Sequence, residues 1–245
     1  METIYRRNEP IRAGQMDTLR RLNLPHTIEL FQDMTAAHSE LLQISNRRMH
    51  EESDAFWVVT RMKLRFYQPL FFPEEITCET WPLMPGTLAC GRCYRILKDV
   101  ATAVEGRSEW LLLDRRTHSP RRVDTTCYPL TEEHETSVVL PEPFLRFKET
   151  LGEEDLVYET TVRSSDIDMS HHTNNVQYVR MMMNALSVSE WEALTPRTFE
   201  IRYERESREG DPLQIARRAV PDGFLFQITR SDGTRLASAR LTVTV

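Results

Sequence analysis

A dense run of polar side chains occupies residues 164–175, in the order Ser-Ser-Asp-Ile-Asp-Met-Ser-His-His-Thr-Asn-Asn. Asp168 and His172 are four residues apart, so a carboxylate could orient and charge an imidazole for proton transfer. Asn174 and Asn175 favour the start of a helix, where backbone N–H groups and the helix dipole suit a carbonyl oxygen that gains negative charge. The same residues are equally typical of a capped loop that only satisfies its own backbone.

The other motifs do not predict a metal site, a redox site, a serine nucleophile or a phosphate-binding loop. Cys90-Gly-Arg-Cys93 is a single CxxC inside an alternating strand pattern, without a second pair or a nearby histidine, and does not favour a zinc or redox site. No serine stands in a G-x-S-x-G context, and the eight glycines form no phosphate-binding loop. We therefore expect neither a metal nor a cofactor.

The composition is that of a folded, reduced protein. The chain has 245 residues, of which 40% are hydrophobic and 28% are charged, and its four cysteines are too few for a disulfide scaffold. No apolar run approaches the roughly 18 residues that span a membrane, and the N-terminus is polar from the start. We expect a cytoplasmic protein without a membrane span. The net charge of −6 argues against nucleic acid as a partner.

Two helices must position the polar run. The first is predicted over residues 25–43, where Pro25 suits a first helical position. The second begins at Asn174 and Asn175, and its apolar stripe continues through Val176, Val179, Met183 and Leu186. Both helices are apolar over more than one narrow face, so each should be largely wrapped by other structure.

Most other segments alternate apolar and polar residues as strands do. Strands are predicted over residues 56–66, 76–81, 88–97 and 110–113 after the first helix. Residues 198–245 predict an antiparallel meander after the second helix, with hairpin turns at Asp222-Gly223 and Asp232-Gly233. Prolines and acidic residues interrupt the pattern over residues 129–150, which we expect to form a linker.

The order strand, helix and antiparallel strands therefore occurs twice. Leu64-Arg65-Phe66 matches Ile201-Arg202-Tyr203, and Asp17 precedes the first helix about as far as Asp168 precedes the second. One long helix held by an antiparallel sheet is the hotdog architecture. We predict an α+β fold of two tandem hotdog domains, residues 1–128 and 151–245, each a long central helix wrapped by an antiparallel β-sheet. Another α+β arrangement is the alternative.

The polar run also resembles a known signature. Acyl-acyl-carrier-protein (acyl-ACP) thioesterases carry Asp-x-Asn-x-His-x-Asn-Asn-x-x-Tyr where the helix of the C-terminal hotdog opens. The matching residues here are Asp168, His172, Asn174, Asn175 and Tyr178. Trp110-Leu-Leu-Leu-Asp114 and Tyr203-Glu-Arg-Glu206-Ser207 resemble two further segments of that family. The resemblance covers essentially the whole chain.

Two residues depart from the family pattern. Ser170 stands where the family has asparagine, and it can still donate and accept a hydrogen bond. Ser207 stands where the family has cysteine, which argues against a thiol nucleophile. Glu206 is then the stronger candidate for activating water directly. Glu206 is an odd number of residues beyond Tyr203, so a bulge or a strand end must re-aim it.

The resemblance implies hydrolysis of a fatty acyl thioester, delivered on the phosphopantetheine arm of acyl carrier protein. Its implied catalytic residues are Asp168, Ser170, His172, Asn174 and Glu206, with either Glu206 or the Asp168–His172 pair as the base. Backbone N–H groups near Thr173 to Asn175 would polarise the thioester carbonyl, and the residues around the substrate would be Thr173, Asn175, Tyr178 and Ser207.

The first repeat lacks the acid–base set, because Arg20-Arg21 lies near the place of His172 and Pro69 takes the place of Glu206. In the family this half holds the acyl chain. Trp57 and Phe66, together with Phe56 and Leu88, could line such a slot, although ordinary core packing explains each of them as well.

Acyl carrier proteins are acidic, so this acidic chain should offer them a local basic face. Arg208 lies beside Glu206, and Arg217 and Arg218 are expected on the neighbouring strand. Two other functions stay open: a hotdog thioesterase acting on acyl-coenzyme A, and a non-catalytic acyl-binding protein. The sequence leaves the choice between monomer and homodimer open as well.

Overall fold

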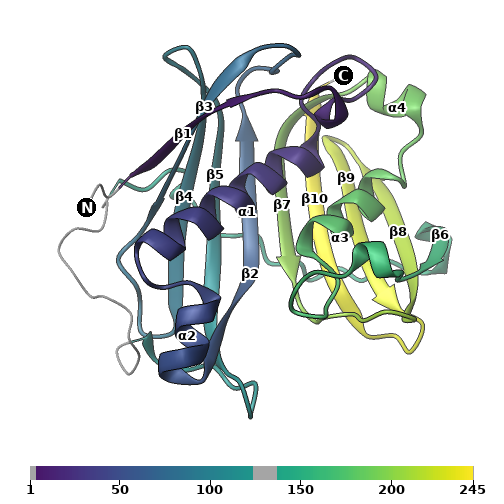
Figure 1. Cartoon of the computed structure of the whole chain (residues 1–245). Coiled ribbons are helices and arrows are strands. Elements are labelled where there is room, and N and C mark those ends of the chain that lie inside the picture. Colours follow the sequence, from purple (N-terminus) through teal and green to yellow (C-terminus); the bar gives the residue numbers. More distant parts are fainter. Residues whose placement is uncertain (1–3, 124–136, 245) are drawn as a thin grey trace.

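A computed structural model describes residues 4–123 and 137–244. Cys127 and the first part of the predicted linker lie outside these residues. The described strands form one antiparallel ten-stranded sheet in the order β1-β3-β4-β5-β2-β7-β10-β9-β8-β6, and the helices α1 and α3 lie against the same face of it (Figure 1). None of the helices in the described residues is long and apolar enough to cross a membrane.

Each half of the chain supplies five neighbouring strands of this sheet. The first half contains β1 (Tyr5–Pro10), α1 (Leu24–Leu41), α2 (Asn46–Ser53), β2 (Ala55–Phe66), β3 (Glu75–Pro82), β4 (Ala89–Lys98) and β5 (Ala101–Asp114). The second half contains β6 (Leu156–Thr161), α3 (Asn175–Met183), α4 (Val188–Glu192), β7 (Thr195–Tyr203), β8 (Pro212–Val220), β9 (Gly223–Arg230) and β10 (Arg235–Thr244).

The prediction of a simple meander over residues 198–245 was wrong in one respect. Only β8, β9 and β10 follow one another in space, whereas β7 pairs with β10 on one side and with β2 on the other. The first half repeats this order, with β2 beyond β5. Alternation of apolar and polar residues marks a strand and its faces, but it does not select the neighbours of that strand.

The helices differ in length between the halves. The side chain of Asn23 caps α1 by accepting from the His26 amide, and the helix ends at Leu41, two residues before the predicted end at residue 43. Asn174 caps α3 by accepting from the Val176 amide, but α3 ends at Met183. The expectation of one long helix in the second half was therefore wrong, because the chain turns at residues 184–186 and Ser187 caps the separate helix α4.

The main hydrophobic core lies between the helices and the sheet and is continuous across both halves. Phe31 and Met34 of α1, and Val179 and Met182 of α3, are almost completely buried in it. Burial of such side chains is the main force that fixes a helix on a sheet. The core therefore holds the start of α3, where the polar run lies, in a fixed position relative to the sheet.

Equivalent residues of the two halves meet at the centre of the molecule with opposite charges. Lys63 of β2 and Glu200 of β7 are each three residues from the end of their strand, and they lie opposite each other in the register. Glu29 of α1 and Arg180 of α3 are each six residues beyond their N-cap, and they form an ion pair. A pseudo-twofold axis therefore passes between the members of each pair.

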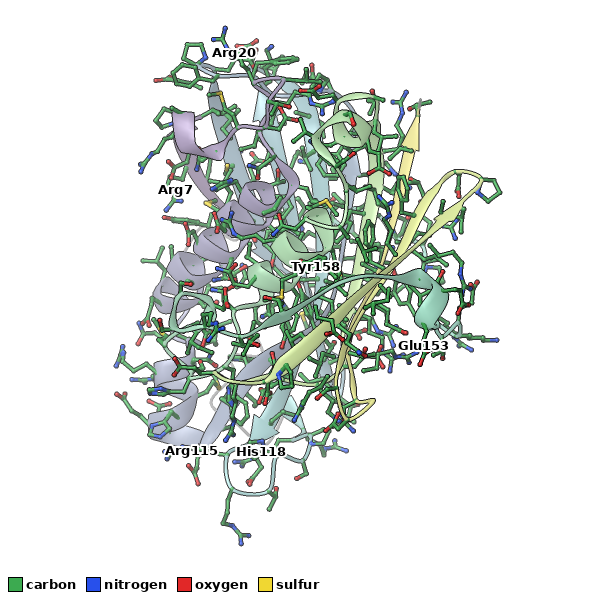
Figure 2. All side chains as sticks on the ribbon, turned by 90° about the vertical axis from the view of Figure 1, so that its right-hand side faces the viewer. Arg7, Arg20, Arg115, His118, Glu153 and Tyr158 are labelled. Atoms are coloured by element: carbon green, nitrogen blue, oxygen red, sulfur yellow. The ribbon has the colours of Figure 1, made fainter. Side chains whose placement is uncertain are left out.

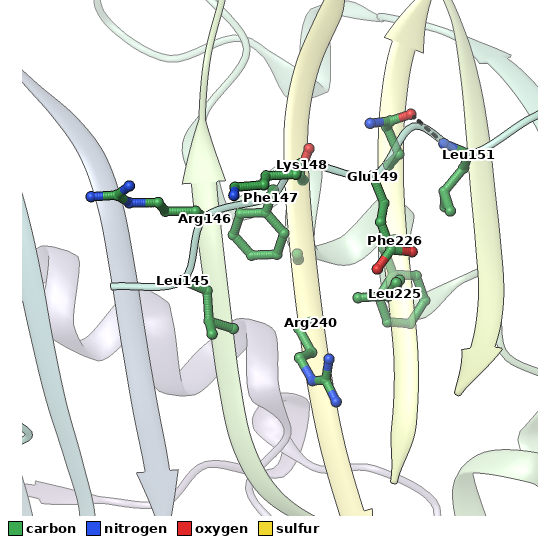
Figure 3. A pocket seen from close by; sticks show the side chains of 12 residues that line it. Leu145, Arg146, Phe147, Lys148, Glu149, Leu151, Leu225, Phe226 and Arg240 are labelled. Atoms are coloured by element: carbon green, nitrogen blue, oxygen red, sulfur yellow. Dashed lines mark hydrogen bonds between the residues drawn. The ribbon is translucent and has the colours of Figure 1, made fainter. Parts of the chain in front are cut away.

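Residues 137–151 cross the face of the sheet opposite the helices. Lys63 donates to the Glu142 carbonyl, the Leu145 amide donates to Glu200, and the Leu151 amide donates to the Gln227 side chain at 3.1 Å. Figure 3 shows residues 145–151 passing over the strands β7, β10 and β9, where they enclose a small hollow of about 100 Å³. This segment contains the described end of the expected linker, while the domain limits themselves stay a prediction.

Candidate active site

The polar run and the loop after β7 are joined at a buried serine. The Thr173 amide donates to the Ser207 carbonyl at 2.9 Å. The Ser207 hydroxyl lies 2.7 Å from the Thr173 hydroxyl and 2.8 Å from the Tyr178 hydroxyl. Because Ser207 is fully buried and Thr173 is 5% exposed, these bonds are shielded from water and fix residues 204–211 against the start of α3.

Glu206 and His172 face each other across this joint. Their Oε2 and Nε2 atoms are 3.1 Å apart, and the side chains are 43% and 20% exposed. Because β7 ends at Tyr203, Glu206 lies beyond the strand and is free of its alternation. Of the two alternatives weighed from the sequence, a bulge or a strand end, the strand end is the one observed.

Asp168 contacts the backbone of its own loop. Its Oδ1 accepts from the Ser170 amide at 2.8 Å, and its amide donates to the His172 carbonyl at 2.9 Å. No ion pair in the described part of the chain joins the Asp168 carboxylate to the imidazole. The carboxylate in contact with His172 is therefore that of Glu206, and Asp168 and Ser170 hold the shape of the loop.

The backbone amides at the start of α3 are mostly engaged. The Thr173 amide donates to Ser207, the Asn174 amide donates to the Asp166 carbonyl at 2.8 Å, and the Asn174 side chain caps the helix. Asn175 is the first residue of α3, and its amide has no acceptor among the described residues. Of the backbone donors expected near Thr173 to Asn175, the Asn175 amide is thus the one left for a substrate, because the tight turn uses the others in its own hydrogen bonds.

Three residues expected around the substrate lie too deep to touch it. Tyr178 is 2% exposed, and its hydroxyl accepts from the Ser207 amide at 3.0 Å. Burial raises the pKa of the Tyr178 phenol. Tyr178, Ser207 and Thr173 bond to one another, so their role in this structure is to support the site.

Arg208 is the expected arginine that does lie at the site. Its Nη2 is 3.5 Å from the His172 Nε2. A hollow of about 280 Å³ adjoins it, lined by Ser164, Ile167, His171, Arg208 and Glu209. Arg208 therefore lies both at the hollow and in contact with His172.

The expectation for Arg217 and Arg218 was wrong. Both lie on β8, which β10 and β9 separate from β7. Arg217 bonds to Glu190 of α4 at 2.9 Å, whereas Arg218 bonds to Asp155 at 3.0 Å. Because adjacent strand residues point to opposite faces, the two guanidinium groups cannot belong to one basic patch.

Trp57 and Phe66 do not line one slot either. Trp57 donates to the Ile44 carbonyl and packs on a small core cluster under α2, whereas Phe66 lies at the other end of β2 on the main core. Phe56 contacts His118, which Figure 2 shows at the end of the molecule opposite Arg20. Leu88 is 42% exposed. Strand alternation identified apolar strand residues here, but it gave neither their degree of burial nor a common position along the strands.

Comparison with known protein families gives two matches that together cover most of the chain. The family model for the acyl-ACP thioesterase N-terminal domain matches residues 2–129, and the model for the C-terminal domain matches residues 149–243. This chain belongs to the acyl-ACP thioesterase family.

Sequence relatives of this family member are distant. The oleoyl-acyl carrier protein thioesterase 2 of Arabidopsis thaliana is 25% identical over 216 residues, which cover 80% of this chain and 56% of that protein. The oleoyl-acyl carrier protein thioesterase of Coriandrum sativum is 26% identical over 181 residues, covering 67% and 46% respectively. The chain thus spans about half the length of these relatives.

Solved structures of the family show the same fold. The acyl-ACP thioesterase from Bacteroides thetaiotaomicron matches with a TM-score of 0.89 and 17% identity, covering 99% of this chain and 98% of that one. The 12:0-ACP thioesterase from Umbellularia californica matches with a TM-score of 0.87 and 18% identity, covering 99% and 97%. The predicted double hotdog fold is confirmed.

Sequence analysis missed the residues that hold Arg208 in this thioesterase family member. The Arg208 amide donates to the Asp211 carboxylate at 2.9 Å, and Asp211 forms an ion pair with Arg230 at 3.6 Å. Arg230 also donates to the Glu206 carbonyl at 3.3 Å. An aspartate three residues after Arg208 is typical of a side-chain-capped turn, and this signal could have identified Asp211.

The CxxC segment is built into the sheet. Cys90 packs in the cluster under α2, whereas Cys93 packs with Trp81 on the opposite face of β4. Burial raises the pKa of the Cys90 thiol to about 12. The two thiols thus point away from each other. No cluster of potential metal ligands occurs in the described residues.

Proposed function

We propose that this protein hydrolyses fatty acyl thioesters carried on acyl carrier protein and releases the free fatty acid. The observation that carries the proposal is the contact of 3.1 Å between Glu206 and His172 beside the start of α3. A carboxylate held by an imidazole beside an unoccupied backbone amide is suited to water-dependent acyl transfer. Membership of the acyl-ACP thioesterase family supports the choice of substrate.

In the proposed mechanism, Glu206 takes a proton from water while the oxygen of that water attacks the thioester carbonyl carbon. The Asn175 amide donates to the carbonyl oxygen as it gains negative charge. The tetrahedral intermediate then collapses, the carbon–sulfur bond breaks, and the proton held by Glu206 passes to the departing sulfur. His172 holds the Glu206 carboxylate in place through its Nε2.

A direct hydrolytic route also fits the surroundings of Ser207. A nucleophile must reach the carbonyl carbon, but the Ser207 hydroxyl is fully buried and bonded to Thr173 and Tyr178. We therefore assign Ser207 to support of the site. The second half, residues 151–245, carries the chemistry in this proposal, and residues 1–128 hold the acyl chain.

The test is the release of free thiol from three matched substrates with the same acyl chain, on acyl carrier protein, coenzyme A and pantetheine. We expect the highest kcat/KM for the acyl carrier protein substrate. A preference for coenzyme A would favour the alternative acyl-coenzyme A thioesterase. Binding of all three without release of thiol would favour an acyl-binding protein and overturn hydrolysis.

A further inference from the structure

Two side chains of opposite charge approach the same nitrogen of His172. The Glu206 Oε2 is 3.1 Å from Nε2, and the Arg208 Nη2 is 3.5 Å from the same atom. A guanidinium only donates hydrogen bonds and a carboxylate only accepts them, whereas a ring nitrogen either carries a proton or presents a lone pair. Nε2 can therefore satisfy Glu206 or Arg208, but not both at once.

The two partnerships have different consequences for Glu206. When Nε2 carries a proton, it donates to Glu206 and holds the carboxylate in place. When Nε2 is unprotonated, it accepts from Arg208 and leaves Glu206 without its partner. The side chain that occupies Nε2 thus decides whether the proposed base is held in its working position.

Arg208 is also the residue that connects His172 to the hollow. It lines the hollow together with Ser164, Ile167, His171 and Glu209. Its backbone is anchored by Asp211 and by the buried Ser207 next to it, while its side chain is exposed. A guanidinium on a fixed backbone can turn from His172 into the hollow by rotation of its own side chain alone.

We propose that the hollow receives the amide-bearing pantetheine arm of the substrate, and that an arm carbonyl draws Arg208 away from His172, so that Nε2 becomes the donor to Glu206. Arg208 is then a positioning residue that couples arm binding to alignment of the base. This inference rests on the proposed function, because pantetheine is the arm of the proposed carrier.

The chemistry of the hollow fits this occupant. A pantetheine arm carries two amides between its thiol and its hydroxyl-bearing far end, and the hollow offers a hydroxyl, an imidazole, a guanidinium, a carboxylate and the apolar Ile167. Its volume of about 280 Å³ lies near the lower end of the range for small-molecule sites. Arg208 links the hollow to His172, beside which the thioester end of the arm would have to lie.

The first experiment measures the protonation of Nε2 by ¹⁵N NMR of the histidine rings, with His172→Gln as the assignment control and free pantetheine as the probe. In the wild type, pantetheine should move the His172 Nε2 signal towards that of a protonated ring nitrogen. In Arg208→Met, the signal should lie at this limit without pantetheine and should not move when it is added.

Arg205→Met is the matched control, because it removes the same charge from the same loop. The Arg205 guanidinium is exposed and bonds to the neighbouring Glu204 carbonyl at 3.0 Å. This variant should show the wild-type signal and the wild-type response. An unchanged Nε2 signal in the wild type with saturating pantetheine, or a wild-type response in Arg208→Met, would overturn the inference.

The second experiment compares hydrolysis of acyl-pantetheine with that of an acyl-ethanethiol ester of the same chain length, which lacks the amides. Arg208→Met should lower kcat/KM for acyl-pantetheine by about tenfold, the effect of losing one hydrogen bond from a charged donor. It should raise kcat/KM for the ethanethiol ester above the wild-type value, because Nε2 then donates to Glu206 without an arm carbonyl to draw Arg208 away. Equal losses on both esters would mean that Arg208 serves the fold. Absence of hydrolysis in the wild type would contradict the proposed function, whereas the NMR response tests the arm site separately.

Discussion

The two capping loops of the molecule, residues 12–23 and residues 163–174, have the same backbone and opposite properties. Each begins with a short 3-10 helix, Ala13–Gln15 in the first and Ser164–Asp166 in the second. Each contains an isolated bridge, Met16 to Leu22 and Ile167 to Thr173. Arg20 and His171 hold the same place with φ values of 61° and 62°. The repeat is thus closer in backbone than in sequence.

The side chains of the first loop close it. Arg21, which takes the place of His172, bonds to the Asp17 carboxylate at 2.7 Å and to the Leu194 carbonyl at 2.9 Å. Trp191 of α4 also donates to Asp17, at 3.0 Å. The loop that faces it supplies Leu70 where the second half has Ser207, since the Leu22 amide donates to the Leu70 carbonyl at 2.7 Å.

The second loop keeps its corresponding groups accessible. Its imidazole faces Glu206 and contacts Arg208, which lines a hollow, and the Asp168 carboxylate accepts from an amide of its own loop. The comparison teaches that the backbone of this loop does not decide whether it forms a reactive site. The decision lies with the side chains that differ, Arg21 against His172 and Leu70 against Ser207, and with Trp191 of α4, which bonds to the first loop.

The largest expected effect is on catalysis by the open loop. Glu206→Gln and His172→Ala should each lower kcat by about 10²–10⁴-fold, because each removes one member of the pair that activates water. Acyl-ACP hydrolysis measures the effect, and thermal unfolding should be unchanged. Glu192→Gln, an exposed carboxylate on α4, is the control. Near-full activity of Glu206→Gln would transfer the role of base to His172.

The second effect is on stability through the closed loop. Asp17→Ala should lower the free energy of unfolding by about 3 kcal/mol, because a largely buried carboxylate with bonds to Arg21, Trp191 and two backbone amides is lost. Asp168→Ala is the matched variant in the open loop, and it should cost only about 1 kcal/mol. Denaturant unfolding measures both. Equal losses would mean that the two loops are held in the same way.

The third effect concerns the joint beneath the open loop. Ser207→Ala should lower the free energy of unfolding by about 1–3 kcal/mol, because the buried hydroxyls of Thr173 and Tyr178 lose their partner. Most of the activity should remain, and mass spectrometry of the wild type should detect no acyl group on Ser207. A trapped acyl-Ser207 would replace the direct attack of water by covalent catalysis.

The smallest expected effect concerns Trp191 of α4, which donates to Asp17 of the closed loop. Trp191→Phe keeps the aromatic packing but removes the indole bond to Asp17, so it should cost about 1 kcal/mol of stability and leave kcat unchanged. Unfolding and hydrolysis measured on the same preparation check both parts. A changed kcat would show that the closed loop takes part in catalysis.

Sequence reasoning located the polar loop at the start of α3 because local signals determine it. Spacing within short segments was enough to predict the N-cap at Asn174 and the twofold repeat. It also showed that Asp17 in the first half is equivalent to Asp168 in the second. The pairing of β7 with β2 and β10 was not predictable in this way, because strand neighbours depend on contacts between distant parts of the chain.

The misassigned residues have the same physical explanation. Arg217 and Arg218 lie close to Glu206 in the sequence, but two strands separate β8 from β7. The break after Met183 was hidden because the apolar stripe continues to the buried Leu186. Whether Arg208 meets His172 depends on the side-chain geometry of two loops, and spacing along the chain does not contain that information.

The opposite charges on the pseudo-twofold axis also distinguish this chain from a dimer of two identical subunits. In a dimer of two identical subunits, each residue on the axis faces its own copy, so Lys63 would face lysine and Glu29 would face glutamate. Glu200 and Arg180 could become complementary to them only after the two copies could mutate separately. Both pairs therefore need two halves that differ in sequence, and neither could form between identical, self-pairing subunits.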